Sequence, residues 1–334
     1  MSIPHLPRTI LVAPDAFKGT FSAGEVAAAV GRGLETRGWP VELCPIADGG
    51  EGTLEVLAEA LGGELRSANV SDPLGRPIEA QFALIAPPRG PDTAVVETAR
   101  ASGLHLVSEA ERDAVDASTA GTGELISAAV AAGAERVLLG VGGSATTDGG
   151  AGAVRAIRAA GGLGRASLTV LCDVQTPFED AARVFAPQKG ASPEQVRRLG
   201  ERLQRLARRY ERDPRGVPMT GAAGGLSGGL WAVFGAELRP GAAFMLDALA
   251  FDARMRAARA VVTGEGRLDL QSLAGKALSE VAMRARQAGV PTHAVVGSDG
   301  LDLFERRILD LQAVLEASTL GQLERAGRRL GDLL

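Results

Sequence analysis

Aromatic residues and cysteines are scarce in this chain, and each shortage excludes a class of protein. Aromatic side chains make up only 4% of the 334 residues, too few to indicate stacking platforms for nucleic-acid bases. The two cysteines, Cys44 and Cys172, cannot build a disulfide framework, and both lie in apolar, strand-like stretches. We interpret them as buried thiols of a protein in a reducing compartment.

Long hydrophobic runs and blocks of like charge are absent as well. No apolar run reaches the roughly 18 residues that a membrane helix needs. The amino-terminal stretch lacks both the charged and the apolar regions of a signal peptide. The 36 basic and 40 acidic residues are interspersed, and the net charge is −4, so no basic surface for nucleic acid or an anionic membrane is indicated. We therefore expect a cytoplasmic protein that binds neither nucleic acid nor membrane.

The standard nucleotide-binding and zinc-binding motifs are also missing. Gly275-Lys276 is followed by Ala277, and Leu270 occupies the first glycine position of a G-x-x-x-x-G-K-[ST] loop. The first strand-like run leads into PDAFKGT rather than G-x-G-x-x-G, and no zinc-ligand spacing occurs. A P-loop is excluded, and a dinucleotide site and a zinc site are disfavoured.

Only three lysines occur, Lys18, Lys189 and Lys276, and every other Lys or Arg position is arginine. Each lysine lies directly beside a glycine, in the sequences FKGT, QKGA and AGKA. A planar guanidinium does not replace a compact ammonium where geometry is tight. We therefore predict that the three lysines stand where a small, flexible cation is needed.

Glycine, by contrast, is abundant at 44 residues and is clustered in loops. The apolar run 10–13 precedes a loop, a helix expected from a Ser22–Glu25 capping box to about residue 37, and a strand at 41–47. This strand–loop–helix order predicts a parallel α/β sheet. It returns with expected helices at 123–132 and 192–210 and strands at 136–141, 168–172, 260–263, 293–296 and 312–315.

Residues 63–99 interrupt this order with three strand-like pieces joined by turns, which predicts a meander. The loop sequence D-G-G-x-G occurs on both sides of it, at 48–52 and 148–152. We therefore expect an α/β protein of two interleaved lobes, with mainly parallel sheets flanked by helices and the active site in the cleft between them. The lobes are predicted at residues 1–66 plus 290–334 and at residues 67–289.

Polar side chains and glycine-rich loops follow the predicted strands, at the ends where open parallel sheets bind ligands. Glycines let backbone N–H groups approach an anion, and a following helix amino terminus favours it. Carboxylates on neighbouring loops suit Mg²⁺, which prefers oxygen ligands. Glycine-rich loops, lysines, carboxylates and Mg²⁺ are together the parts of a phosphoryl-transfer site. The strand ends carry Asp15, Lys18, Asp48, Ser144, Asp148, Asp173, Glu265, Arg267 and Asp269.

The motifs resemble, in order and over nearly the whole chain, those of the bacterial glycerate kinases of the glyoxylate and aldarate-breakdown type. This resemblance implies ATP, Mg²⁺ and D-glycerate as ligands and 2-phosphoglycerate as the product. The connection 159–167 is shorter than in that family, and CDVQTPF and ATTD stand where the family has CDVxNPL and ATND. The motifs are APDAFKGTFSA (13–23), ADGGEGT (47–53), DPLGRP (72–77), GGSATTDGGAG (142–152), CDV (172–174), FAPQKGA (185–191), GAAGGLSGG (221–229) and TGEGRLDLQSLAGKA (263–277).

We assign three sets of roles to these residues. Asp269 is favoured over Glu265 as the base, with Asp48 or Asp148 next, although Asp269 could instead cap the following helix. Lys18 is expected to contact phosphate or the glycerate carboxylate, and Arg267 to bind one of them in bidentate fashion. The predicted catalytic set is Lys18, Asp48, Asp148, Arg267 and Asp269, the nucleotide-binding set is Gly143, Ser144, Gly224, Gly225 and Lys276, and the magnesium set is Asp148, Asp173 and Glu265.

Three functions remain open at this stage. The first is glycerate 2-kinase activity, and the second is phosphorylation of the 3-hydroxyl or of another small hydroxy acid. The third, a non-catalytic sugar-acid sensor, would not need so many charged strand ends and would usually carry a partner module. The sequence also leaves open whether the chain forms a homodimer.

Overall fold

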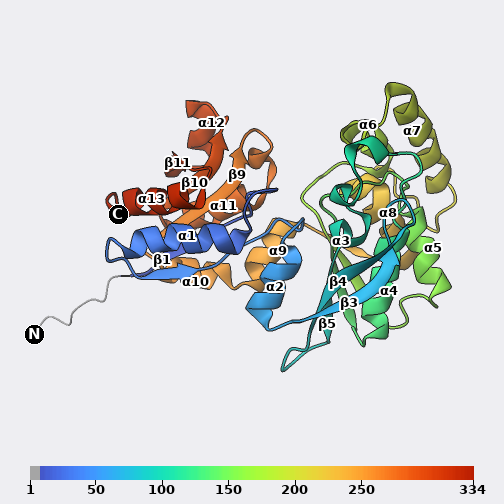
Figure 1. Cartoon of the computed structure of the whole chain (residues 1–334), viewed down its shortest axis with the longest axis horizontal. Coiled ribbons are helices and arrows are strands. Elements are labelled where there is room, and N and C mark those ends of the chain that lie inside the picture. The colour runs from blue at the N-terminus through green and yellow to red at the C-terminus, as the bar shows by residue number, and fades with distance from the viewer. Residues whose placement is uncertain (1–7) are drawn as a thin grey trace, which may run out of the picture. The chain divides into compact units, whose positions relative to one another are not determined.

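The computed structural model describes residues 8–334, which form two α/β units (Figure 1). Unit 1 contains residues up to Asp48 and from Ala242 to Leu334, and unit 2 is the continuous segment Gly49–Gly241. The amino-terminal stretch in which no signal peptide was recognised lies partly in residues 1–7, outside the described residues. Within residues 8–334, no helix combines the length and the apolar character that crossing a bilayer requires.

The sheet of unit 1 has five strands, and all of its neighbouring strands are parallel. Its three inner strands are largely buried because helices cover both faces. Since every strand runs the same way, all five carboxyl ends meet at one edge, and this edge carries the candidate site. The order is β11-β10-β9-β1-β2, with β1 (Ile10–Pro14), β2 (Val41–Leu43), β9 (Ala260–Leu268), β10 (Thr292–Asp299) and β11 (Leu311–Glu316).

Helices pack on both faces of this sheet. On one face α1 (Ala23–Glu35) and α13 (Leu320–Gly331) lie side by side in Figure 1, and a Cβ at Gly33 would come within 2.9 Å of the Cα of Gly327. Val295 of β10 packs on this face. Ala294 and Val296 pack on the opposite face, with α11 (Ala277–Ala288). The remaining helices of unit 1 are α9 (Gly241–Ala248), α10 (Phe251–Ala257) and α12 (Leu303–Ile308).

The sheet of unit 2 joins an antiparallel half to a parallel half. The first three strands are antiparallel neighbours, which confirms the predicted meander. The last four are parallel, so their carboxyl ends also meet at one edge. The order is β3-β4-β5-β6-β7-β8, with β3 (Glu64–Ser71), β4 (Pro77–Ile85), β5 (Thr93–Glu97), β6 (Arg136–Gly140), β7 (Ser167–Leu171) and β8 (Glu237–Arg239).

Two apolar clusters hold the helices of unit 2. One joins α4, α5 and α8 to the sheet, and the other packs α6 and α7 around Phe178, which is fully buried. Within the helix predicted at 192–210, α7 begins after a Ser192 cap with Pro193 in its first turn. The helices are α2 (Thr53–Leu61), α3 (Thr98–Ser102), α4 (Ala120–Ala131), α5 (Ala151–Ala159), α6 (Ala181–Phe185), α7 (Pro193–Ala207) and α8 (Ala222–Phe234).

The observed fold is the predicted α/β class, with two mainly parallel sheets flanked by helices, but the unit boundaries differ from those expected. They fall after Asp48 and after Gly241 rather than after residues 66 and 289. The reason is that β9 pairs with β1, with Ile10 opposite Ala260, so residues 242–289 belong to unit 1. At the other boundary, α2 and β3 pack with the strands of unit 2.

Candidate active site

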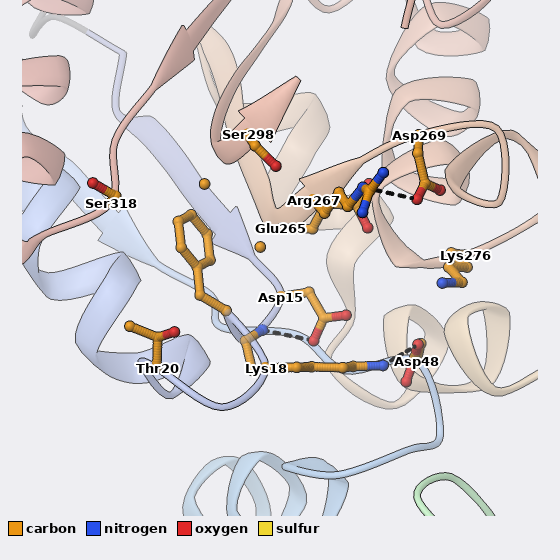
Figure 2. Close-up of a pocket in the computed structure, with 14 residues that line it drawn as sticks. Asp15, Lys18, Thr20, Asp48, Glu265, Arg267, Asp269, Lys276, Ser298 and Ser318 are labelled. Atoms are coloured by element: carbon orange, nitrogen blue, oxygen red, sulfur yellow. Dashed lines mark hydrogen bonds and ion pairs between the residues drawn. The ribbon is translucent and has the colours of Figure 1, made fainter. Parts of the chain in front are cut away.

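A cavity of about 420 Å³ opens at the carboxyl edge of the unit 1 sheet (Figure 2). Its walls come from the loops after β1 and β2, from the carboxyl ends of β9 and β10, and from the segment leading into α11. The charged side chains in its lining are Asp15, Lys18, Asp48, Glu265, Arg267, Asp269 and Lys276. The sequence motifs PDAFKGT and TGEGRLD therefore meet in one place, as predicted from the strand ends.

The segment after β1 forms a tight loop that holds Asp15 and Lys18 in this cavity. Phe17 is buried in the core beneath the loop, and its N–H donates to the carbonyl of Phe21 at 2.9 Å. A Cβ at Gly266 of β9 would lie 3.2 Å from the Cα of Phe17. A side chain at residue 266 would push the two strand ends apart by a few tenths of an ångström, and glycine avoids this.

Lys18 pairs with one carboxylate of this cavity and feels the charge of a second. Its Nζ donates to Asp48 Oδ2 at 3.0 Å, and its side chain is half exposed, whereas that of Asp48 is largely buried. Burial alone would lower the pKa of Lys18, but the charges of Asp48 and Asp15 outweigh this effect and raise it. The ammonium is therefore held ionised at a place that an anionic ligand can reach.

Asp15 is the carboxylate with the clearest sign of chemical tuning. It is 5% exposed, and its Oδ1 accepts the N–H of Ala16 at 2.7 Å. Burial raises the pKa of Asp15 well above its ordinary value, Asp48 adds to this, and Lys18 opposes it. A carboxyl with a raised pKa that lines an open cavity has the properties of a general base.

Glu265, on β9, is buried in the same wall, and its Oε1 has no hydrogen-bond partner. Burial raises the pKa of Glu265, against the opposing effects of Ser272 and Lys276. An unpartnered buried carboxylate oxygen is costly unless a ligand satisfies it. This geometry fits the predicted role of Glu265 as an oxygen donor to Mg²⁺, which prefers such ligands.

Arg267 and Asp269 are placed differently from the other predicted residues. The side chain of Arg267 is 74% exposed, and its Nε lies 3.4 Å from Asp269 Oδ2. The Oδ1 of Asp269 accepts the N–H of Gln271 at 2.9 Å, and its own N–H donates to Ser272 Oγ. Asp269 thus shapes the turn before the short helix η5 (Ser272–Ala274), the capping role named above as the alternative to catalysis. The geometry favours Asp15 over Asp269 as the base.

Asp148, in unit 2, is the centre of a hydrogen-bond network. It is 1% exposed and accepts the backbone N–H groups of Thr119, Gly150 and Gly152 at 3.0 Å, together with the Thr119 hydroxyl. A carboxylate has about four lone-pair sites, and these bonds use them. The geometry therefore favours a structural role for Asp148, in place of the predicted catalytic and metal-binding roles.

We expect Asp148→Ala to destabilise the fold strongly. The substitution leaves three buried N–H groups without an acceptor, and each unsatisfied group costs about 1–3 kcal/mol. Urea unfolding should show a loss of about 3 kcal/mol or more. As a control, Asp116→Ala removes an exposed carboxylate from the neighbouring segment and should change stability by less than about 0.5 kcal/mol. Equal stability of the two variants would contradict a structural role for Asp148.

The predicted nucleotide-binding residues of unit 2 form two loops in contact. Gly143 and Ser144 follow β6, while Gly224 and Gly225 lie in a left-handed turn that begins α8. A Cβ at Gly224 would lie 2.1 Å from the carbonyl oxygen of Thr146, so only glycine fits there. Gly149 N–H donates to the carbonyl of Gly224 at 3.0 Å, which ties the two loops together.

Asp173 follows β7 at the same edge of the unit 2 sheet and is partly buried. Within the described part of the chain, no three His, Cys, Asp or Glu side chains gather in a metal-binding cluster. Mg²⁺ in nucleotide sites typically uses one or two carboxylates plus phosphate oxygens and water. The magnesium set of Asp148, Asp173 and Glu265 stays a prediction, and of its members Asp148 is already engaged in the network described above.

Sequence reasoning gave no role to two buried carboxylates that the structure makes prominent. Glu97, the last residue of β5, is 1% exposed and accepts the N–H of Leu54 at 2.9 Å, which anchors the start of α2. Burial raises its pKa to about 7. Asp15 was noted at a strand end without a role. A charged residue closing an all-apolar strand was the available signal for both.

Comparisons with known proteins agree with this architecture. The model of the glycerate kinase family matches residues 10–161 and 158–326. The two matched segments overlap at residues 158–161, at the start of the short connection between α5 and β7. A glycerate kinase of Halalkalibacterium halodurans is 39% identical, covering 87% of this chain and 86% of that protein. The glycerate 2-kinase of Escherichia coli is 36% identical, covering 96% and 93%.

A solved structure shows the same fold. It is the crystal structure of a Salmonella typhimurium LT2 protein assigned as glycerate kinase 2, with a TM-score of 0.83, 34% sequence identity and 98% coverage of both chains. Lysine and carboxylates gathered at the ends of parallel strands are the arrangement of a small-molecule phosphotransferase. With a family match over most of its length, the chain belongs to the glycerate kinase family.

Proposed function

We propose that this protein transfers the γ-phosphoryl group of ATP to the C2 hydroxyl of D-glycerate and releases 2-phosphoglycerate. The observation that carries the proposal is the unit 1 cavity, in which buried Asp15 lies beside the Lys18–Asp48 pair. A 2-kinase among the close relatives favours the C2 hydroxyl. Because ATP is supplied there, we place the reaction in the cytoplasm.

In this proposal the unit 1 cavity binds glycerate. Lys18 is the half-exposed cation that attracts the glycerate carboxylate or the transferring phosphate. Asp15 accepts the proton of the attacking hydroxyl, because a secondary alcohol is a poor nucleophile until a base takes its proton. Asp48 holds the Lys18 ammonium in place. Arg267 is exposed and free to swing toward an anion, while Asp269 shapes its turn.

The phosphates of ATP are assigned to Gly143, Ser144, Gly224, Gly225 and Lys276, as expected from the sequence. Glycine-rich loops at strand ends bring backbone N–H groups to phosphate oxygens. Glu265, with its unpartnered oxygen, fits a Mg²⁺ ligand, and Asp173 is the other candidate. Bound Mg²⁺ would supply charge neutralisation on the phosphates.

Product analysis distinguishes this function from the alternatives. With ATP, Mg²⁺ and D-glycerate, phosphorus NMR should show 2-phosphoglycerate, and a chelator should abolish turnover until Mg²⁺ is restored. A 3-phosphate product would show that the C3 hydroxyl faces the base. A sugar-acid sensor would bind glycerate without consuming ATP, and full activity in chelator would remove Mg²⁺ from the mechanism.

A further inference from the structure

Lys189 occupies an unusual environment in unit 2. It is 3% exposed and closes the short helix η4 (Pro187–Lys189). Its Nζ donates to Ser144 Oγ at 2.9 Å and to the carbonyl oxygen of Thr146 at 2.5 Å. A buried lysine thus supports from below the loop assigned above to the phosphates of ATP.

No carboxylate lies within ion-pair distance of Lys189 in the part of the chain that the structure describes. A buried ammonium normally needs such a partner because desolvation penalises its charge. Around it the loop also contains polar atoms without partners, the hydroxyls of Thr146 and Thr147. An environment with a buried cation and spare hydroxyl groups is suited to an anion that arrives from outside the chain.

The charges around Lys189 come from two segments. Asp148 lies on the loop above, and its oxygens are used by the network described above. Arg112 and Asp113 line a small buried void together with Lys189, and the Nε of Arg112 has no hydrogen-bond partner. The Oδ1 of Asp113 accepts the N–H of Val115 at 2.9 Å. These segments leave the ammonium incompletely compensated.

Burial lowers the pKa of Lys189 to about 7, against the opposing effect of Asp148. A neutral amine and an ammonium are therefore both present near neutral pH. An anion placed close to the amine favours its charged form and raises its pKa. Binding of a phosphate group would therefore draw a proton onto Lys189.

We propose that Lys189 is a positioning residue that orients the Ser144 hydroxyl toward a phosphate oxygen of the bound nucleotide and gains in that phosphate the counter-anion it lacks. Because Ser144 Oγ accepts from the ammonium, its own proton points away from Nζ and is free to donate to the phosphate. The inference rests on the proposed function, since it takes the 142–150 loop as part of the nucleotide site.

Calorimetry of nucleotide binding tests the charge part of this inference. A non-hydrolysable ATP analogue is bound at pH 8, where its phosphates are already deprotonated, in two buffers of different ionisation heat. The wild-type protein should take up more than about half a proton per site. Ser144→Ala should keep this uptake, and Lys189→Met, of similar length but without charge, should lose it. Binding by the wild-type protein without proton uptake would overturn the inference, even if Lys189→Met does not fold.

A double-mutant cycle tests the positioning part. Ser144→Ala and Lys189→Met should each lower kcat/KM for ATP by about 10²-fold, with KM for glycerate unchanged. The double variant should be at least about tenfold more active than the product of the two losses predicts, because both substitutions remove the same Lys189–Ser144 hydrogen bond. Fully multiplicative losses would show that Lys189 does not act through Ser144.

The two proposals fail in different ways. If wild-type protein makes no 2-phosphoglycerate from ATP and glycerate, the proposed function fails. If it makes the product but shows neither proton uptake nor coupling between the two positions, only the role of Lys189 fails. Lys189 would then be a structural lysine, and its replacement would shift the unfolding midpoint without separating kcat from KM.

Discussion

Replacing Asp15 by asparagine should lower kcat by about 10²–10⁴-fold, the usual contribution of a positioned general base. Asparagine keeps the size and the acceptor oxygen for the Ala16 N–H, but it cannot take a proton from the glycerate hydroxyl. Nucleotide binding should be unchanged. Lys18, which is assigned to the glycerate carboxylate, is left in place. KM for glycerate should therefore change by less than about tenfold.

The pH dependence gives a second measure of the same residue. Burial and Asp48 raise the pKa of Asp15 in the folded chain, so the base is lost by protonation as the pH falls through a value above the ordinary carboxylate range. Activity should therefore decline on the acid side earlier than for an ordinary aspartate. In Asp15→Asn, this acid limb should disappear from the residual activity.

Stability should move the opposite way from activity. A carboxyl whose folded pKa is raised favours the fold when protonated, and this stability is lost as the pH rises through the folded pKa. Above that pKa the ionised Asp15 therefore costs stability, and there Asp15→Asn should melt at the same temperature as the wild-type protein or higher. Loss of activity with loss of stability would point to a structural Asp15.

Asp269→Asn is the matched control for Asp15→Asn. It changes a second carboxyl of the same cavity, one whose oxygen is used by the turn at Gln271. We expect a loss of less than about tenfold, since a turn-shaping hydrogen bond is worth about 1 kcal/mol. If Asp269→Asn instead loses more activity than Asp15→Asn, the base is the residue favoured by sequence alone.

Lys18→Met should lower kcat/KM for glycerate by about 10³-fold, because a charge-assisted contact to an anion is lost together with the Lys18–Asp48 pair. Lys18→Arg should restore only part of this activity, since a planar guanidinium does not fit the place of a compact ammonium. The measurement is steady-state kinetics with glycerate varied at saturating ATP, alongside thermal unfolding to show that the fold is intact.

An exposed cation far along the chain provides the control for Lys18. Arg183 is 72% exposed and pairs with Asp180 three residues before it. Arg183→Met should leave kcat/KM for glycerate within about twofold of wild type, since surface ion pairs contribute little. Near-normal activity of Lys18→Met would remove Lys18 from the mechanism and leave Lys276 as the lysine of the cavity.

The sequence predicted the fold and the convergence of the strand ends because both follow from local patterns. Apolar strands followed by polar loops define a parallel sheet, and parallel strands must end at one edge. Asp15, Lys18 and Glu265 are therefore found together without any knowledge of their contacts. The unit boundaries were not predictable in this way, because the pairing of β1 with β9 joins residues 250 positions apart.

The roles of single carboxylates were less predictable, because a sequence does not show where a side chain points. Asp148 and Asp48 stand in the same D-G-G-x-G motif, yet Asp148 turns inward to cap backbone N–H groups and Asp48 faces a lysine. Asp269 turns toward its own loop. Lys189 was singled out by the scarcity of lysine, but its burial depends on packing among α6, α7 and the 109–117 segment.

The order in which the units are joined along the chain has a consequence for synthesis. Residues 49–241 are continuous, so unit 2 can complete its core while the ribosome is still making the rest. Strand β1, made first, can pair with β2 early, but it has to wait for β9 before it gains its neighbour on the other side. One edge of this apolar strand thus stays open during translation, and the first part of this protein to be made is among the last to complete its sheet.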